Sequence, residues 1–118
     1  MGFSKDSAVR YNRGKGGENM AIVETSISPV GTGSTSLSPY VAGCHAILKE
    51  EKRIKYQLTP MGTILEGDLD VILEVIRKMH EIPFQKGALR VSTLIKIDDR
   101  RDKTATMEQK VQAVKDKL

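Results

Sequence analysis

The stretch IVETSISPVGTGSTSLSPY, residues 22–40, leads from a strand through a glycine-rich loop into a helix. β-Branched residues are frequent from position 21 to position 30, where Pro29 and Gly31 end the run, so a first strand is predicted there. Ser38 followed by Pro39 is typical of a helix N-cap with proline in the first helical position. The loop between them combines flexible glycines with hydroxyl groups, and its N–H groups would point at one place. The loop is a candidate for the entrance to a ligand site, although a flexible loop without a ligand explains its composition equally well.

The apolar spacing predicts the next elements along the chain. Residues at helical spacing mark an amphipathic helix, namely Tyr40, Val41, Cys44, Ile47 and Leu48. Alternation over residues 54–58 predicts a second strand with one buried face, and Pro60-Met61-Gly62 makes the turn into a third strand at 63–67. Asp68 is the expected N-cap of a second helix, which we expect Pro83 to end. Its buried stripe comprises Leu69, Ile72, Leu73, Ile76 and Met79.

The C-terminal third of the chain predicts one more strand and one more helix. Residues 89–97 alternate with a period of two, placing Leu89, Val91, Thr93, Ile95 and Ile97 on one face. A terminal helix follows the charged loop 98–103, and Thr106 with Gln109 can form its capping box. Its apolar positions are Met107, Val111, Val114 and Leu118.

The predicted order β-α-β-β-α-β is the split βαβ, or ferredoxin-like, arrangement. This is an α+β fold with a four-stranded antiparallel sheet, two helices on one face and an additional C-terminal helix. The second face of the sheet carries polar residues from every strand and also Leu94. That face is either solvated or buried against another subunit, and the apolar Leu94 favours a homo-oligomer.

Composition limits the class of protein. The 118 residues suffice for one domain, which we place at 20–118, after a polar, glycine-rich arm or extension at 1–19. Half of the net charge of +4 lies in that arm, and the basic residues elsewhere alternate with acidic ones, so we expect no nucleic-acid partner. A single cysteine excludes an internal disulfide, and no apolar run is long enough to cross a bilayer. With no signal-type N-terminus, a cytoplasmic location and no membrane partner are expected.

Three motifs resemble those of the thiamine-binding protein family, which consists of small cytoplasmic microbial proteins. They are SPVGTGSTSLS at 28–38, PMGTILEG at 60–67 and LIKIDDRR at 94–101, and the resemblance covers residues 20–118. It implies a ferredoxin-like fold and subunits paired through their sheets into dimers and tetramers, so a homotetramer is expected. It also implies a site for thiamine or its hydroxymethylpyrimidine part, with binding rather than catalysis as the activity.

The same resemblance implies which residues form the ligand site. By motif they are the loop residues Gly33, Ser34, Thr35 and Ser36 and the strand residues Gly62, Thr63, Leu65 and Glu66. A carboxylate such as Glu66 and a hydroxyl such as Thr63 could bind an aminopyrimidine, and an acid nearby would favour a thiazolium cation. Since Glu66 lies in an otherwise apolar strand, it must be paired or face a wet site. A solvent-facing position at a sheet edge explains it equally well.

Other chemistries find little support in the chain. The loop lacks the lysine and the spacing of a nucleotide-binding P-loop, and Cys44, His45 and His80 have no metal-ligand spacing. No catalytic residues, metal or cofactor are therefore predicted. The leading hypothesis is a non-enzymatic binder of thiamine type. A structural or regulatory oligomer without a ligand is the alternative, and an enzyme acting on a small heterocycle ranks third.

Overall fold

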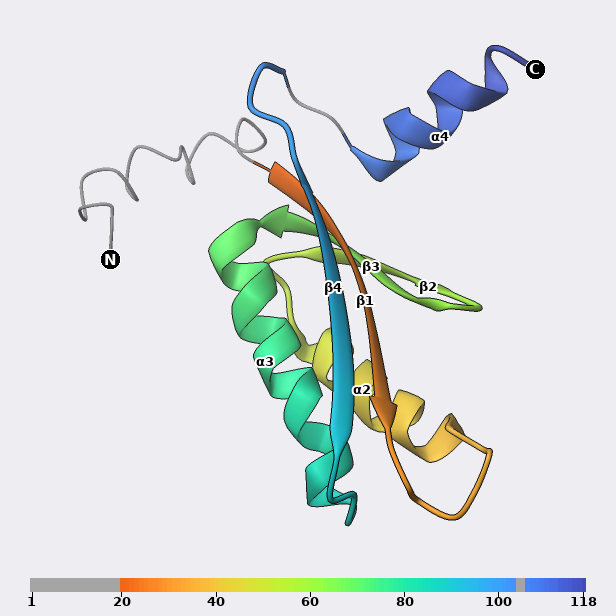
Figure 1. Ribbon diagram of the computed structural model, residues 1–118. Helices are drawn as coiled ribbons and strands as arrows, with labels where there is room; N and C mark the ends of the chain where they lie inside the picture. The colour runs from red at the N-terminus through yellow and green to blue at the C-terminus, as the bar shows by residue number, and fades with distance from the viewer. Residues whose placement is uncertain (1–19, 104–105) are drawn as a thin grey trace.

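The computed structural model describes residues 20–103 and 106–118, so the predicted arm at 1–19 lies outside the described residues. Four antiparallel strands form one sheet in the order β2-β3-β1-β4. Two helices, α2 and α3, lie together on one side of the sheet, while α4 stands apart where β1 begins and β4 ends (Figure 1). The strands are β1 (Met20–Pro29), β2 (Lys55–Thr59), β3 (Gly62–Asp68) and β4 (Val91–Asp99), and the helices are α2 (Ser38–Glu50), α3 (Leu69–Gln85) and α4 (Met107–Lys115). The predicted fold class is confirmed.

The register of the sheet leaves one half of β1 unpaired on one side. β1 pairs with β4 along nearly its whole length, from Ala21 to Pro29. Its pairing with β3, in contrast, ends at the pair Thr25–Thr63, because β3 turns there into β2 through the hairpin. Beyond Thr25 the side of β1 that faces away from β4 has no strand neighbour among residues 20–103 and 106–118, and α2 lies over this region (Figure 1).

The core lies between the sheet and the two covering helices and is almost wholly aliphatic. Alternate residues of β1 and β3 face it, among them Val23 and Leu65, and α3 packs against both strands. The most deeply buried residues of the helices are Leu48, Ile72 and Val75. Burying a side chain of this size stabilises the fold by roughly 1.5–3 kcal/mol. The predicted stripe of α3 is correct except at Leu73, which is exposed while Val75 is buried.

Two predicted helix ends are wrong. Ser38 is the first residue of α2 rather than its N-cap, and the N-cap residue Leu37 makes no side-chain capping bond. Pro83 does not end α3, which continues to Gln85. A proline within a helix leaves the carbonyl four residues before it without its usual N–H donor. Here that carbonyl belongs to Met79, and the thiol of Cys44 donates to it over 3.5 Å, so α2 replaces the missing bond.

The predicted caps of α3 and α4 are confirmed. Asp68 accepts a hydrogen bond from the Asp70 N–H, and Thr106 and Gln109 form the full capping box. β4 begins at Val91, so Leu89 lies outside the strand that was predicted to contain it. Leu94 is 71% exposed on the face of the sheet opposite α2 and α3. The apolar side chains of Val111 and Val114 on α4, and of Leu118 beyond its end, are also exposed.

Candidate functional site

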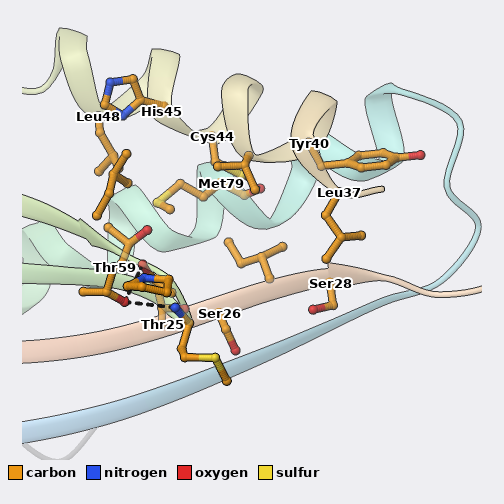
Figure 2. A pocket seen from close by; sticks show the side chains of 17 residues that line it. Thr25, Ser26, Ser28, Leu37, Tyr40, Cys44, His45, Leu48, Thr59 and Met79 are labelled. Atoms are coloured by element: carbon orange, nitrogen blue, oxygen red, sulfur yellow. Dashed lines mark hydrogen bonds between the residues drawn. The ribbon is translucent and has the colours of Figure 1, made fainter. Parts of the chain in front are cut away.

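A cavity of about 240 Å³ lies between α2, the unpaired half of β1 and the β2–β3 hairpin. α2 and its N-cap residue supply one wall through Leu37, Tyr40, Val41, Cys44, His45 and Leu48, which recur at helical spacing. In Figure 2 the side chains of Leu37 and Leu48 extend toward the strands. β1 contributes residues 25–28, the hairpin contributes residues 58–63, and α3 contributes Met79. Among the described residues that line the cavity, none is Asp, Glu, Lys or Arg.

The hairpin end of the cavity is held by threonine hydroxyls and a close backbone approach. Thr25 Oγ1 donates to the Leu94 carbonyl over 2.8 Å, which ties β1 to β4. Thr59 Oγ1 donates to the Gly62 carbonyl over 3.0 Å and accepts from the Met61 N–H over 3.3 Å, which closes the turn. A Cβ at Gly62 would lie 2.5 Å from the Thr25 carbonyl oxygen, so this approach requires glycine.

On the helical wall, Cys44 is a structural group rather than a reactive one. Its thiol is buried and donates to the Met79 carbonyl. Burial also raises the pKa of the Cys44 thiol, which disfavours the thiolate that nucleophilic chemistry requires. The side chain therefore contributes shape to the cavity, next to Leu48.

His45 lines the cavity and also carries a buried ring nitrogen, Nδ1, without a hydrogen-bond partner among the described residues. Its ring contacts Tyr56 edge to face, with 5.4 Å between the ring centroids. Figure 2 shows His45 beside Leu48, at the end of the cavity away from Leu37 and Ser28. Most buried polar atoms in proteins have a partner, so the unpaired Nδ1 of His45 is unusual.

The structure places the predicted site residues in four different surroundings. Gly62 and Thr63 line the cavity. Leu65 belongs to the hydrophobic core, and Glu66 lies on the opposite face of the sheet. Gly33, Ser34, Thr35 and Ser36 are exposed in the loop before α2 and do not line the cavity. Within that loop Ser34 Oγ accepts from the Ser36 N–H over 3.1 Å, while Gly31 and Gly33 have positive φ.

Glu66 has protein partners of its own. Its carboxylate is 1% exposed, and Oε1 accepts a hydrogen bond of 2.7 Å from the Met107 N–H, the first amide of α4. Its Oε2 lies 3.9 Å from Nζ of Lys55, which also contacts the Glu108 carboxylate at 3.4 Å. A carboxylate at a helix N-terminus is favourable because the first amides have no partner within the helix. Glu66 thus anchors α4 to the sheet.

Sequence reasoning missed His45, Tyr40 and Leu37 as cavity residues. The helical stripe of Tyr40, Val41, Cys44 and Leu48 was available, but its spacing indicates only that these residues face the sheet. Whether they meet a packed core or an open volume depends on where β3 stops pairing with β1, at Thr25. His45 adjoins the stripe, and a polar residue next to apolar neighbours was the signal that could have marked it.

Comparison with known proteins agrees with this fold and these motifs. The sequence pattern of the thiamine-binding protein family matches residues 23–115. The chain belongs to the thiamine-binding protein family. It is 53% identical over 98 residues to a UPF0045 protein of Staphylococcus xylosus, an alignment that covers 80% of this chain and 92% of that protein. The UPF0045 protein YqgV of Bacillus subtilis is 52% identical over 98 residues, with 80% and 94% of the two chains covered.

A solved structure supports the same conclusion. The chain resembles the hypothetical protein MJ1052 of Methanocaldococcus jannaschii with a TM-score of 0.73 and 36% identity, over 81% of this chain and 96% of that one. In the part of the chain that the structure describes, no three His, Cys, Asp or Glu side chains are grouped so that they could hold a metal ion. Nor does any described helix have the length and apolar character needed to cross a membrane.

Proposed function

We propose that the protein binds thiamine or its hydroxymethylpyrimidine part in the cavity under α2, without catalysing a reaction on it. The observation that carries the proposal is the position of the family motif at 60–67, whose Gly62 and Thr63 line the cavity. Ligand pockets are commonly apolar with a few polar groups that fix orientation. The apolar side chains of α2, the threonine hydroxyls and His45 together match that description.

Binding without catalysis is proposed because the cavity offers few groups for chemistry. A nucleophile requires a nearby base or a lowered pKa, and burial raises the pKa of Cys44. The carboxylate that the motif contains, Glu66, is bonded to α4 on the other face of the sheet. An enzyme acting on a heterocycle would require its acid and base to come from elsewhere.

We also propose that the protein works as a cytoplasmic homo-oligomer, a dimer or tetramer. Leu94 is exposed on the open face of the sheet, as are Val111 and Val114 on α4. Apolar surface of this kind is commonly covered by another subunit. An oligomer without a ligand is the rival function. Light scattering at micromolar concentration checks the assembly, and a monomer throughout that range would contradict it.

Calorimetric titration with thiamine and with hydroxymethylpyrimidine tests the binding. Val41 is half exposed at the cavity wall, so Val41→Trp should fill the cavity and abolish binding with little cost to the fold. Ala42→Trp is the matched control, because Ala42 is exposed on the same helix and does not line the cavity. Binding that survives in Val41→Trp would place the ligand elsewhere. If the unaltered protein binds neither probe, the assembly-only function is favoured.

A further inference from the structure

The cavity lies against an edge of β1. The successive residues Thr25, Ser26, Ile27 and Ser28 all line it. Successive side chains of a strand point to opposite faces, so a cavity on one face would be lined by every second residue only. Consecutive residues line one cavity when it meets the strand along its edge, where the backbone lies. Since β4 pairs with the other edge of β1 as far as Pro29, the cavity lies at the edge that β3 leaves beyond Thr25.

The register shows which backbone groups point to this edge. In an antiparallel sheet the N–H and C=O of one residue point to the same side, and those of the next residue point to the other side. The Val30 N–H donates to the Arg90 carbonyl over 2.8 Å, so Val30 points toward β4. The Thr25 carbonyl points toward β3, because a Cβ at Gly62 would lie 2.5 Å from its oxygen. The register with β4 is one to one along this stretch, so Ile27 points the same way as Thr25, away from β4.

Ile27 is the residue of this free edge that offers both a donor and an acceptor. Pro29, the next residue that points the same way, has no N–H. Proline is tolerated in a strand where its missing N–H would face no neighbouring strand, which agrees with an unpaired edge here. Outside the strand ladders, none of the described residues bonds to the Ile27 N–H or carbonyl. Ile27 is half-buried, so its backbone pair is available to a molecule in the cavity.

We propose that the backbone of Ile27 recognises the ligand, its N–H donating to the edge of a planar heterocycle and its carbonyl accepting from the same edge. Two such bonds side by side repeat the pattern of a hydrogen-bonded pair in an antiparallel sheet. The ligand must then carry an acceptor next to a donor. An aminopyrimidine does so, with a ring nitrogen beside its exocyclic amine. This inference rests on the proposed function and names the edge of the ligand that is bound.

Amide hydrogen exchange, followed for each residue by NMR, tests the unpaired N–H directly. In the unliganded protein the Ile27 amide should exchange at least about tenfold faster than the amides of Ser26 and Ser28, which point toward β4. Saturating hydroxymethylpyrimidine should slow the exchange of Ile27 by at least about tenfold. Ser26 and Ser28 are the matched controls, because they line the same cavity from the same strand.

Proline substitutions separate recognition from structure. Ile27→Pro removes the N–H at the cavity but no bond of the β1–β4 ladder, and Ile27→Ala is its matched control because it loses the side chain and keeps the N–H. Ile27→Pro should bind hydroxymethylpyrimidine about tenfold more weakly than Ile27→Ala. Ser28→Pro removes a ladder bond and should be the least stable of the three in denaturant unfolding.

The bond to the carbonyl is tested through the ligand. An analogue of hydroxymethylpyrimidine without the 4-amino group cannot donate to the Ile27 carbonyl, so it should bind the unaltered protein about tenfold more weakly. Ile27→Pro keeps the carbonyl and should keep this preference. If Ile27→Pro folds poorly, the exchange rates of the unaltered protein decide the role of the N–H.

The possible results distinguish the two proposals. An Ile27 amide that exchanges as slowly as its neighbours in the unliganded protein overturns the unpaired edge. A ligand that binds by calorimetry but leaves the exchange of Ile27 unchanged overturns the role of Ile27 and leaves the binding function standing. If the unaltered protein binds neither probe, the binding function fails and this inference fails with it.

Discussion

The two ends of β3 have opposite surroundings although only a few residues separate them. At the first end, Gly62 and Thr63 face an uncharged cavity beneath α2. At the other, Glu66 is buried on the opposite face of the sheet, where it accepts the first amide of α4 and lies near Lys55. Successive side chains of a strand point to opposite faces, so residues 63 and 66 cannot share one side of the sheet. One continuous motif thus serves a ligand cavity and a helix anchor.

The largest effect is expected at the cavity end, from Gly62→Val. Its Cβ would lie 2.5 Å from the Thr25 carbonyl oxygen, a backbone atom that cannot move without disturbing β1. Overpacking of this kind costs roughly 1–3 kcal/mol in the free energy of unfolding, and the shifted hairpin should also abolish ligand binding. Denaturant unfolding and calorimetry measure the two losses. Gln57→Val, at an exposed position of β2 that does not line the cavity, should change neither.

At the Glu66 end of β3, a substitution should change the stability of the fold but not the affinity for the ligand. Glu66→Ala leaves the buried Met107 N–H without its acceptor, which should cost about 1.5–3 kcal/mol, while ligand affinity stays within about twofold. Amide hydrogen exchange should show α4 losing protection first. Glu24→Ala, exposed on the same face of the sheet, is the control. If Glu66→Ala lowers affinity and leaves stability unchanged, the motif-based assignment of Glu66 to the ligand is correct and the division of β3 fails.

The difference between the two ends of β3 can be predicted from the sequence only where it depends on contacts between residues that are close along the chain. Local patterns were sufficient for the order of elements, the cap at Asp68 and the capping box of Thr106 and Gln109, because neighbouring residues determine them. The sequence also predicts that Thr63 and Glu66 lie on opposite faces of the sheet, because they are an odd number of positions apart in one strand. The partner of Glu66 could not be predicted, because Met107 lies 41 positions along the chain. Nothing in the local sequence specifies where α4 docks.

The helix ends show a similar limit. Pro83 predicts the end of α3 when read alone, yet the thiol of Cys44 supplies a donor to the carbonyl that the proline leaves free. The cavity itself depends on β3 leaving β1 at Thr25, which is a matter of register. Composition and periodicity do not determine register at the end of a strand. The cavity residues His45 and Tyr40 could therefore be predicted to face the sheet but not to line an open volume.

Cys44 offers a smaller, local test of the cavity end. Its thiol is buried and its pKa is raised by burial, so alkylation near pH 8 should be slower than for an exposed cysteine. Because Cys44 lines the cavity, saturating hydroxymethylpyrimidine should slow the reaction several-fold further. Mass spectrometry of quenched samples gives both rates. In Val41→Trp the tryptophan fills the cavity, so a slow alkylation rate in this variant does not report on the ligand. The rate of Val41→Trp without ligand is therefore the baseline for that variant.

The smallest effect is expected from an ion pair outside both ends, which tests whether the buried position of Glu66 matters. Arg53 donates to Glu51 and contacts Glu74, with about half of the Arg53 side chain exposed. The hydrogen bond from Arg53 lowers the pKa of Glu51 to about 2. A carboxylate whose pKa is lower in the folded state stabilises the protein at pH values above its unfolded-state pKa. This contribution to stability is lost as the pH falls toward the folded-state pKa. Arg53→Gln should therefore destabilise the fold slightly at pH 7, and the difference from the unaltered protein should shrink between about pH 4.5 and pH 2. Exposed pairs of this kind contribute little. Melting temperatures of both proteins across that pH range measure the difference in stability. If Arg53→Gln destabilises the fold at pH 7 as much as Glu66→Ala does, the burial of Glu66 does not make its contacts stronger than an exposed ion pair.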